Sequence, residues 1–414
     1  MTEQNFGPGP AGALSHVRVL DMSRVLAGPW CGQILADFGA EVIKIERPGS
    51  GDDTRGWGPP YVQDRDGNDT QESAYFLGAN RGKKSVTLHI ASPEGQELAR
   101  RLVKTCDVLI ENYKAGDLAR YGLGYEQLGA LNPGLIYCSI TGFGQSGPMR
   151  NVAGYDFIIQ AIGGLMSITG ERDHLPGGGP QKVGVAVADI TTGMYATVAI
   201  LAALAHRTRG GAGQYIDMAL LDVQVAMMAN MNMNYLVSGQ IPQRFGNAHA
   251  NVVPYQVFNG ADGQLVLAVG NDGQFAKFCK AAGCSFHDDP RFRKNADRVR
   301  HREALIPLLE QVLRQRTVST WVALLEPIGV PVGPINDIAQ VFDHPQVRSR
   351  GMRIDLPHPL AGSVPTVANP IKMSATPVRH ALAPPLLGQH TKEVLIQCGV
   401  AEHELDQFAA RGII

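Results

Sequence analysis

Short apolar runs alternate with amphipathic segments through residues 17–144, and this alternation is the first regularity in the chain. Runs rich in Val, Ile and Leu predict strands, whereas apolar residues spaced three and four apart predict helices. The predicted strands are 17–23, 41–49, 83–90, 107–113 and 135–144, and the predicted helices between them are 27–40, 92–106 and 115–123. Such alternation is typical of an open α/β sheet with parallel strands and right-handed crossovers.

A strongly apolar segment, residues 181–204, follows this region. Its β-branched run at 183–187 predicts a buried strand, and residues 194–204 predict an apolar helix. Asp189 lies between the two, where a carboxylate is next to the free N–H groups and the positive end of the helix dipole. Asp189 can therefore be a helix N-cap alone or a functional carboxylate, and this segment by itself leaves both interpretations open.

The pattern changes after residue 220, where longer and less regular segments begin. A helix is predicted at 220–236, followed by a polar connection at 238–258 that has no helical period. A strand at 263–270 and helices at 272–283, 301–316 and 317–329 predict a smaller α+β domain. Proline clusters mark the region from 351 onward as a strap, with one final helix at 391–409, and the Gly/Pro-rich residues 1–16 as a loose arm.

Composition limits the classes of function. The chain has 414 residues, a formal net charge of −1 and 44% hydrophobic residues, which favour two domains, or one large domain with an insertion, and argue against nucleic acid as a partner. The amino terminus has no signal pattern, and the predicted helix 194–204 is too short for a membrane span. Six scattered cysteines without metal spacing favour a cytoplasmic protein with reduced thiols and no metal site.

The predicted strands carry polar residues at their carboxyl ends, which is where open α/β sheets bind ligands. Arg47 and Asn112 supply a cation and an amide at this edge, and Arg120 follows one helix later. Cations and amides placed together suit a ligand that carries phosphates. Each of the three, taken alone, can equally be a solvated loop residue.

A nicotinamide site is the main alternative for such a sheet, and the motifs do not favour it. The first turn contains Gly28 and Gly32 without a GxGxxG spacing, and Pro29 removes an N–H group that a phosphate-binding turn would use. The glycines of 176–180 are not followed by a lysine, so they are not a P-loop.

Six motifs, in chain order between about residue 15 and residue 400, carry a resemblance to a known family. They are VLDMSRVLAGPWCGQILADFGAEVIKIERPGSGDDTRGWG, NRGKKSV, VLIENYKAGDLARYGL, YCSITGFGQSGP, VGVAVADITTGMYATVAILAAL and PPLLGQHTKEVL. The chain resembles the class III CoA-transferases of the formyl-CoA transferase type. RFGNAHANVVPYQVF and GNDGQF are most similar to the branch that uses succinyl-CoA with dicarboxylic acids such as glutarate.

The resemblance implies an architecture: a Rossmann-like large domain built from both chain ends, a smaller inserted domain, and a homodimer whose subunits interlock. On this sequence the large domain would take 1–220, a linker helix and loop 221–262, and the small α+β domain 263–330. The return linker and the C-terminal part of the large domain would take 331–414.

The resemblance also implies roles for individual residues. Asp189 matches the family's catalytic aspartate. Its CoA-binding positions fall on Arg47, Leu88, Asn112, Tyr113 and Arg120, and its loop over the thioester falls on Arg24, Leu26 and Ala27. Formyl-CoA transferase has a glutamine at the position of Leu26 and a glycine run with no match in residues 246–251, so neither formate nor oxalate is predicted as a substrate.

The chemistry follows from moving CoA between two carboxylates, which needs a nucleophile that can hold an acyl group but no permanently bound cofactor. Asp189 would attack the acyl-CoA carbonyl and form a mixed anhydride, and the CoA thiolate would convert it into an aspartyl-CoA thioester. A second acid would then take the CoA. Backbone N–H groups near Ala27 and Gly28, or on the 246–251 loop, are candidate oxyanion donors. The partners are thus an acyl-CoA thioester and a small carboxylic acid.

A dicarboxylic acid needs a cation for its far carboxylate. Arg24 and Arg244 are candidates for this contact, with His249 as a third, and each can equally be an ordinary surface or interface residue.

Two other functions remain open at the level of sequence. An α-methylacyl-CoA racemase shares the fold and the aspartate, but resembling racemases carry a histidine in an AGHD-like motif as the second base. This chain has AGYD, with Tyr155 at that position, and a tyrosine is a poor base at neutral pH. A non-catalytic acyl-CoA-binding protein is the second alternative, and the intact Asp189 argues against it.

Overall fold

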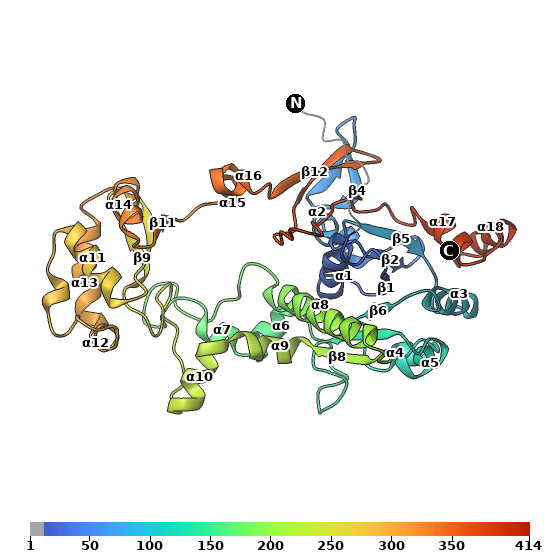
Figure 1. Cartoon of the computed structure of the whole chain (residues 1–414), viewed down its shortest axis with the longest axis horizontal. Coiled ribbons are helices and arrows are strands. Elements are labelled where there is room, and N and C mark those ends of the chain that lie inside the picture. The colour runs from blue at the N-terminus through green and yellow to red at the C-terminus, as the bar shows by residue number, and fades with distance from the viewer. Residues whose placement is uncertain (1–11) are drawn as a thin grey trace. The chain divides into compact units, whose positions relative to one another are not determined.

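The computed structural model describes residues 12–414, which form two compact units (Figure 1). The large unit contains residues up to 163, 184–233 and 346–414, and the small unit contains 164–183 and 234–345. The predicted boundaries therefore need correction, because 164–183 and most of the predicted linker 221–262 group with the small unit. Residues 1–11 of the predicted loose arm lie outside the described residues.

A six-stranded parallel sheet forms the centre of the large unit. Its strands are β1 (Arg18–Asp21), β2 (Glu41–Glu46), β5 (Lys83–Thr87), β6 (Val108–Glu111), β7 (Ile136–Thr141) and β8 (Tyr215–Ala219). Their spatial order is β5-β2-β1-β6-β7-β8. When only these six strands are counted, this is the 3-2-1-4-5-6 order of doubly wound folds. Between β1 and β6 the chain changes the side of the sheet toward which it adds strands. The expected parallel α/β sheet is confirmed.

Helices cover both faces of this sheet, and consecutive strand residues face opposite sides. In β1, Val19 packs into a core that includes Leu35 of α1 and Ile200 of α8. Its neighbour Leu20 packs into the opposite core, with Leu102 of α3 and Leu395 of α17. The chain's last helices thus complete the second face, which makes residues 346–414 part of the large unit.

The helices of the large unit are mostly short apart from α1, α3 and α8. They are α1 (Ala27–Asp37), α2 (Ala74–Ala79), α3 (Pro93–Val103), α4 (Asp117–Arg120), α5 (Tyr125–Leu131), α6 (Asp156–Ile162), α8 (Val187–Thr208), α9 (Leu220–Met227), α17 (Thr391–Gln397) and α18 (Glu402–Ala410). Ser92 caps α3 as its sequence indicates, because its side chain accepts a hydrogen bond from the Gly95 N–H.

Three predicted elements around this sheet were wrong. Residues 183–187 do not form a strand, and α8 starts at Val187 with Ala186 as its N-cap residue. The predicted helix 220–236 is two helices, α9 and α10 (Ala229–Ser238), with a break where Ala229 has a φ of 39°. The predicted helix 391–409 is likewise two helices, α17 and α18, separated by a turn that contains Gly399 at a φ of 81°.

Two antiparallel hairpins in the large unit were not predicted. They are β3 (Tyr61–Gln63) with β4 (Asp69–Ser73), and β12 (Arg353–His358) with β13 (Gly362–Val367). The β3–β4 hairpin is short and polar. In β12 the side chains alternate between exposed and at least partly buried positions, with Leu356 buried, but the prolines of this region were interpreted as an irregular strap.

The small unit has a three-stranded antiparallel sheet with the order β11-β10-β9, covered by helices. Its elements are α7 (Leu165–Ile168), β9 (Tyr255–Asn259), β10 (Gln264–Ala268), α11 (Asp272–Ala282), α12 (Asn295–Arg300), α13 (Arg302–Leu313), α14 (Val318–Leu325), β11 (Val332–Pro334) and α15 (Ile338–Asp343). Helix α16 (Pro345–Ser349) follows at the boundary. Phe258, Phe278 and Trp321 are fully buried in one core of this α+β unit.

Helix α8 is longer than predicted. It has 22 residues and a mean hydropathy of 1.6, so within residues 12–414 it is the one helix that could cross a membrane by length and composition. Its residues Ala196 and Ile200 are buried in the core that α8 shares with α1 and the sheet. One face of α8 is thus packed inside the large unit, which is typical of a helix in a globular domain.

Candidate functional site

Asp189 lies in the first turn of α8, two residues after the helix begins. It is not the N-cap residue, and another carboxylate serves the first turn. Asp156, the first residue of α6, accepts a hydrogen bond from the Ala188 N–H at 2.8 Å through Oδ1. The Asp156 carboxylate therefore occupies a free donor of α8. This observation removes the interpretation of Asp189 as only a helix cap.

Burial, together with the smaller effect of the Asp156 carboxylate, raises the pKa of Asp189 to about 7. No cation contributes to this shift, so at neutral pH the carboxyl is close to half ionised. Burial also raises the pKa of Tyr75 on α2, with the Asp189 charge as the next cause, which places this phenol in the electrostatic field of the aspartate. Sequence reasoning did not single out Tyr75.

A close approach between two helices brings Asp189 near the start of α1. A Cβ atom on Gly193 would lie 2.6 Å from the Ala27 carbonyl oxygen and 3.1 Å from the Trp30 Cβ. Only glycine allows this contact. Asp189 is four residues before Gly193 and so lies on the same face of α8, one turn closer to its N-terminus. The face that carries Asp189 is therefore the face that meets Ala27 and Trp30.

The segment between β1 and α1 crosses the point where the strand order reverses. Asn112, directly after β6, accepts a hydrogen bond from the Arg24 N–H at 2.9 Å and donates to the Arg24 carbonyl at 2.7 Å. The Asn112 amide is thus used to hold the main chain of this segment. Leu26 is the N-cap residue of α1 and Ala27 is its first residue. The first N–H groups of a helix have no acceptor within the helix. Pro29 has no N–H group, so Ala27 and Gly28 supply the free donors at this end of α1.

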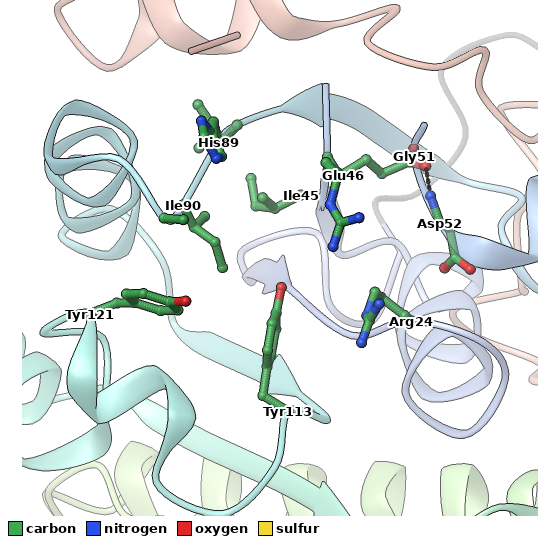
Figure 2. A pocket seen from close by; sticks show the side chains of 12 residues that line it. Arg24, Ile45, Glu46, Gly51, Asp52, His89, Ile90, Tyr113 and Tyr121 are labelled. Carbon is green, nitrogen blue, oxygen red and sulfur yellow. Dashed lines mark hydrogen bonds between the residues drawn. The ribbon is translucent and has the colours of Figure 1, made fainter. Parts of the chain in front are cut away.

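A cavity of about 270 Å³ opens at the carboxyl ends of β1, β2, β5 and β6 (Figure 2). Four predicted residues line it: Arg24, Arg47, Leu88 and Tyr113. In Figure 2 the Tyr113 hydroxyl points toward the middle of the group, with Arg24 on one side and Tyr121 on the other. Ile45, Ile90 and Leu88 give the cavity an apolar part, so it combines cations with apolar and aromatic walls.

Arg24 is already engaged in this cavity wall. Its guanidinium forms an ion pair with Asp53 at 2.9 Å, and its Cζ lies 5.6 Å from the centre of the Tyr113 ring. Arg120 is on α4, where it pairs with Asp117 and leaves 73% of its side chain exposed; it is not among the residues that line the cavity. Tyr155 precedes α6 and is 65% exposed.

Arg244 and His249 belong to the small unit. Arg244 pairs with Asp173 and donates to the carbonyl oxygens of Ser167 and Glu171. The His249 Nδ1 accepts the Asn251 N–H at 3.0 Å. Their contact with a substrate carboxylate stays a prediction, as does that of Arg24.

Buried charges beside the cavity, of which Asp52 also lines it, were missed by sequence reasoning. Lys44 and Asp52 form an ion pair at 2.8 Å, and Lys83 and Asp21 form another at 2.8 Å, with all four side chains fully buried. Lys44 interrupts the apolar run 41–46, and a charged residue inside a buried strand is the signal that could have identified it. Across residues 12–414, no cluster of three or more His, Cys, Asp or Glu side chains could hold a metal ion.

The comparisons with known proteins agree with each other over nearly the whole chain. Residues 14–391 match the family model described as CoA-transferase family III. A succinate–glutarate CoA-transferase of Agrobacterium fabrum is 52% identical over 390 residues, which is 94% of this chain and 96% of that protein. The human succinyl-CoA:glutarate CoA-transferase is 43% identical over 383 residues, covering 92% of this chain and 85% of that protein.

Solved structures show the same fold. The crystal structure of a CAIB/BAIF family protein from Brucella suis has a TM-score of 0.82 and 47% sequence identity, and the match covers 94% of this chain and all of that one, 100%.

The raised pKa of Asp189 predicts a pH-dependent effect on stability. Between about pH 4 and pH 7 the folded protein keeps the Asp189 proton while the unfolded chain releases it, so this carboxyl lowers the free energy of unfolding as pH rises through that window. We expect the free energy of unfolding of Asp189→Asn, relative to that of the wild type, to be higher at pH 8 than at pH 5. The difference should grow by about 1 kcal/mol for each pH unit inside the window. Urea unfolding of the variant and the wild type at several pH values measures this difference.

Asp406→Asn, on the exposed side of α18, is the control for loss of a surface carboxylate. An Asp189→Asn stability difference that does not change between pH 5 and pH 8 would contradict the prediction.

Proposed function

The chain belongs to CoA-transferase family III and is a CoA-transferase, and we propose that it moves CoA from succinyl-CoA to glutarate or a similar dicarboxylate. The observation that carries the mechanism is Asp189, a carboxylate with a pKa near 7 beside the start of α1. The substrates are inferred from the names of the relatives at 52% and 43% identity.

The reaction starts when an ionised Asp189 oxygen attacks the thioester carbonyl of succinyl-CoA. The C–S bond breaks, the CoA thiolate leaves, and Asp189 becomes part of a mixed anhydride. The thiolate then attacks the Asp189 carbonyl carbon, which releases succinate and leaves an aspartyl-CoA thioester. No proton, electron or metal is consumed in these two steps.

Glutarate reverses the sequence. One of its carboxylates attacks the aspartyl thioester, the thiolate leaves again, and a second anhydride forms between Asp189 and glutarate. The thiolate attacks the glutaryl carbonyl, so that glutaryl-CoA leaves and Asp189 returns as a free carboxylate. Because an anhydride reacts readily with water, the site must exclude solvent while both intermediates exist.

Burial of Asp189 has two opposite effects on this chemistry. A carboxylate that is poorly solvated is a stronger nucleophile than one in water, whereas the rise of its pKa to about 7 lowers the ionised fraction at neutral pH to about half. Each attack places negative charge on a carbonyl oxygen. The Ala27 and Gly28 N–H groups at the positive end of α1 are the donors that we assign to this oxyanion.

The cavity at the strand ends is the site that we assign to the nucleotide part of CoA. Arg47 and Arg24 would meet its phosphates, and Leu88, Ile90 and Tyr113 would form the walls of the adenine pocket. Asn112 holds the segment that separates this cavity from Asp189. The same assignment leaves Arg120, which lies outside the cavity wall, as a contact for a phosphate at the exposed rim.

A homodimer is also part of the proposal. Helices α6 and α8 expose large apolar side chains on the large unit, including Val198 at 64%, Phe157 at 54% and Met194 at 52% exposure. Exposure of such an apolar surface to water is unfavourable, and an interface with a second copy of the chain would bury it. The free state of all six cysteines supports a cytoplasmic location.

The transfer itself is the first test. Purified protein mixed with succinyl-CoA and glutarate should yield glutaryl-CoA and succinate, detected by mass spectrometry. Asp189→Asn, which keeps the size of the side chain but cannot form the anhydride, should lower kcat by at least about 1000-fold. Asp406→Asn is the matched control and should keep full activity.

Two outcomes would replace the proposal. Exchange of α-hydrogen for deuterium in a branched acyl-CoA, without transfer to any acid, would indicate a racemase. Tight binding of CoA thioesters without any product would indicate a binding protein.

Arg47→Ala tests the CoA site separately. Loss of one guanidinium–phosphate contact should raise the KM for succinyl-CoA by roughly 10- to 100-fold, while the KM for glutarate changes little. Arg101→Ala, which removes an exposed guanidinium on α3, is the control. An equal rise in both KM values would show that Arg47 supports the fold of the site instead of the CoA phosphates.

The dimer predicts a molar mass near 89 kDa, twice the 44.4 kDa of one chain, in light scattering at micromolar concentration. Val198→Glu places a charge on the exposed apolar face of α8 and should shift this mass toward the monomer. Arg101→Ala should leave the mass unchanged. A wild-type protein that has the monomer mass at all concentrations would refute the dimer.

A further inference from the structure

The segment from Ser23 to Leu26 contains the most unusual backbone near the site. Val25 has a φ of 70°, in the left-handed region. β-branched residues rarely occupy this region, because their branched side chain clashes with the backbone there. Such a conformation persists only where the surrounding structure enforces it. The contacts that enforce this conformation affect the site, because Leu26 and Ala27 follow Val25 directly in the chain.

Two fully buried charges contact this segment from behind. Lys44 Nζ donates to the Ser23 carbonyl oxygen at 2.9 Å and pairs with Asp52 Oδ2 at 2.8 Å. The Asp52 Oδ1 faces the Val25 N–H at 3.3 Å. The pair thus contacts the main chain on both sides of Arg24, while Asn112 holds Arg24 itself through two hydrogen bonds.

Asp52 is fixed in turn by its own neighbours. Its Oδ1 also accepts hydrogen bonds from the Thr54 N–H at 3.0 Å and the Thr54 hydroxyl at 2.8 Å, and its N–H donates to Glu46 at 2.9 Å. Lys44 lies in the middle of β2, which is paired on both sides within the sheet. Both charges are therefore held by contacts of their own, in addition to their contact with each other.

A buried ion pair costs desolvation energy that a pair of apolar side chains of similar volume would avoid. Burial opposes ionisation of both partners, yet the Lys44 ammonium brings the pKa of Asp52 down to about 2, and Asp52 and other carboxylates raise that of Lys44. The pair consequently stays charged at every physiological pH. Its contacts to Ser23 and Val25 are made by charged groups, which form stronger hydrogen bonds than neutral ones.

We propose that Lys44 and Asp52 are positioning residues of the active site: they hold Val25 in its left-handed conformation and thereby fix the place of Leu26 and Ala27 beside Asp189. Lys44 does not line the cavity, whereas Asp52 does, through a side chain that is fully buried against Lys44. Their effect on the rate rests on the proposed function, whereas their effect on the segment does not. The alternative is that the pair contributes only to the stability of the sheet and has no specific effect on the segment.

Hydrogen exchange separates these two roles without any activity measurement. In Asp52→Asn, peptides that contain residues 22–30 should exchange their amide hydrogens at least tenfold faster than in the wild type, with little change elsewhere. The matched control is Asp37→Asn, which breaks another buried ion pair, between Asp37 and Arg81, without contacting the segment. Exchange in residues 22–30 that rises equally in both variants would overturn the proposal.

Kinetics then tests the consequence for the reaction. We expect Asp52→Asn to lower kcat at least tenfold more than Asp37→Asn does, with both compared at conditions where they are folded. Glycine adopts a φ of 70° without strain, so the loss caused by Asp52→Asn should be clearly smaller when it is made in a Val25→Gly protein. Equal losses in the two backgrounds would show that the pair does not act through Val25.

If Asp52→Asn does not fold, Lys44→Gln gives the same comparison, since it keeps a donor near the Ser23 carbonyl but removes the ion pair. A wild-type protein that transfers no CoA would refute the proposed function alone, because the exchange experiment would still decide whether the pair positions the segment.

Discussion

The contact between α8 and α1 at Gly193 is the constraint on which the candidate site depends. No side chain fits between the two helices there, because a Cβ on Gly193 would meet the Ala27 carbonyl at 2.6 Å. The close approach fixes the position of α8 along its axis relative to the start of α1. It therefore also fixes the position of Asp189, which is one turn away from Gly193. A larger residue would push the helices apart and move Asp189, the nucleophile that we propose, away from the N–H groups that we assign to the oxyanion.

Burial acts on two aspartates in opposite ways, and the difference lies in their partners. Burial raises the pKa of Asp189 to about 7, and the one charge that contributes, the Asp156 carboxylate, acts in the same direction. Asp52 is buried as well, but the ammonium of Lys44 keeps it ionised, with a pKa lowered to about 2. In the function that we propose, the first environment gives a nucleophilic carboxylate and the second gives a carboxylate that stays charged and holds the main chain. The same side chain can therefore serve catalysis or positioning according to whether a cation is within reach.

The large-unit sheet could be predicted well, because its strands are apolar runs with short β-branched patterns and helices between them. The start of α8 could not, since Val183 to Val187 reads as a strand by composition, and only tertiary contacts show that the helix begins at Val187. Asp189, Arg47 and Leu88 followed from motifs. Lys44 and Asp52 did not, because their role depends on atoms that are distant in sequence, and a single charged residue within an apolar run does not show what it contacts.

The segment from Ser23 to Ala27 connects the two halves of the proposed chemistry. On one side its residue Arg24 lines the cavity that we assign to the CoA nucleotide, and at its other end Ala27 meets the face of α8 that carries Asp189. A displacement of this short segment would therefore alter nucleotide binding and oxyanion stabilisation together. Holding it by main-chain contacts, instead of by the side chains that face the ligand, leaves those side chains free to differ. In the function that we propose, the reaction centre then keeps its position independently of which side chain stands at Leu26.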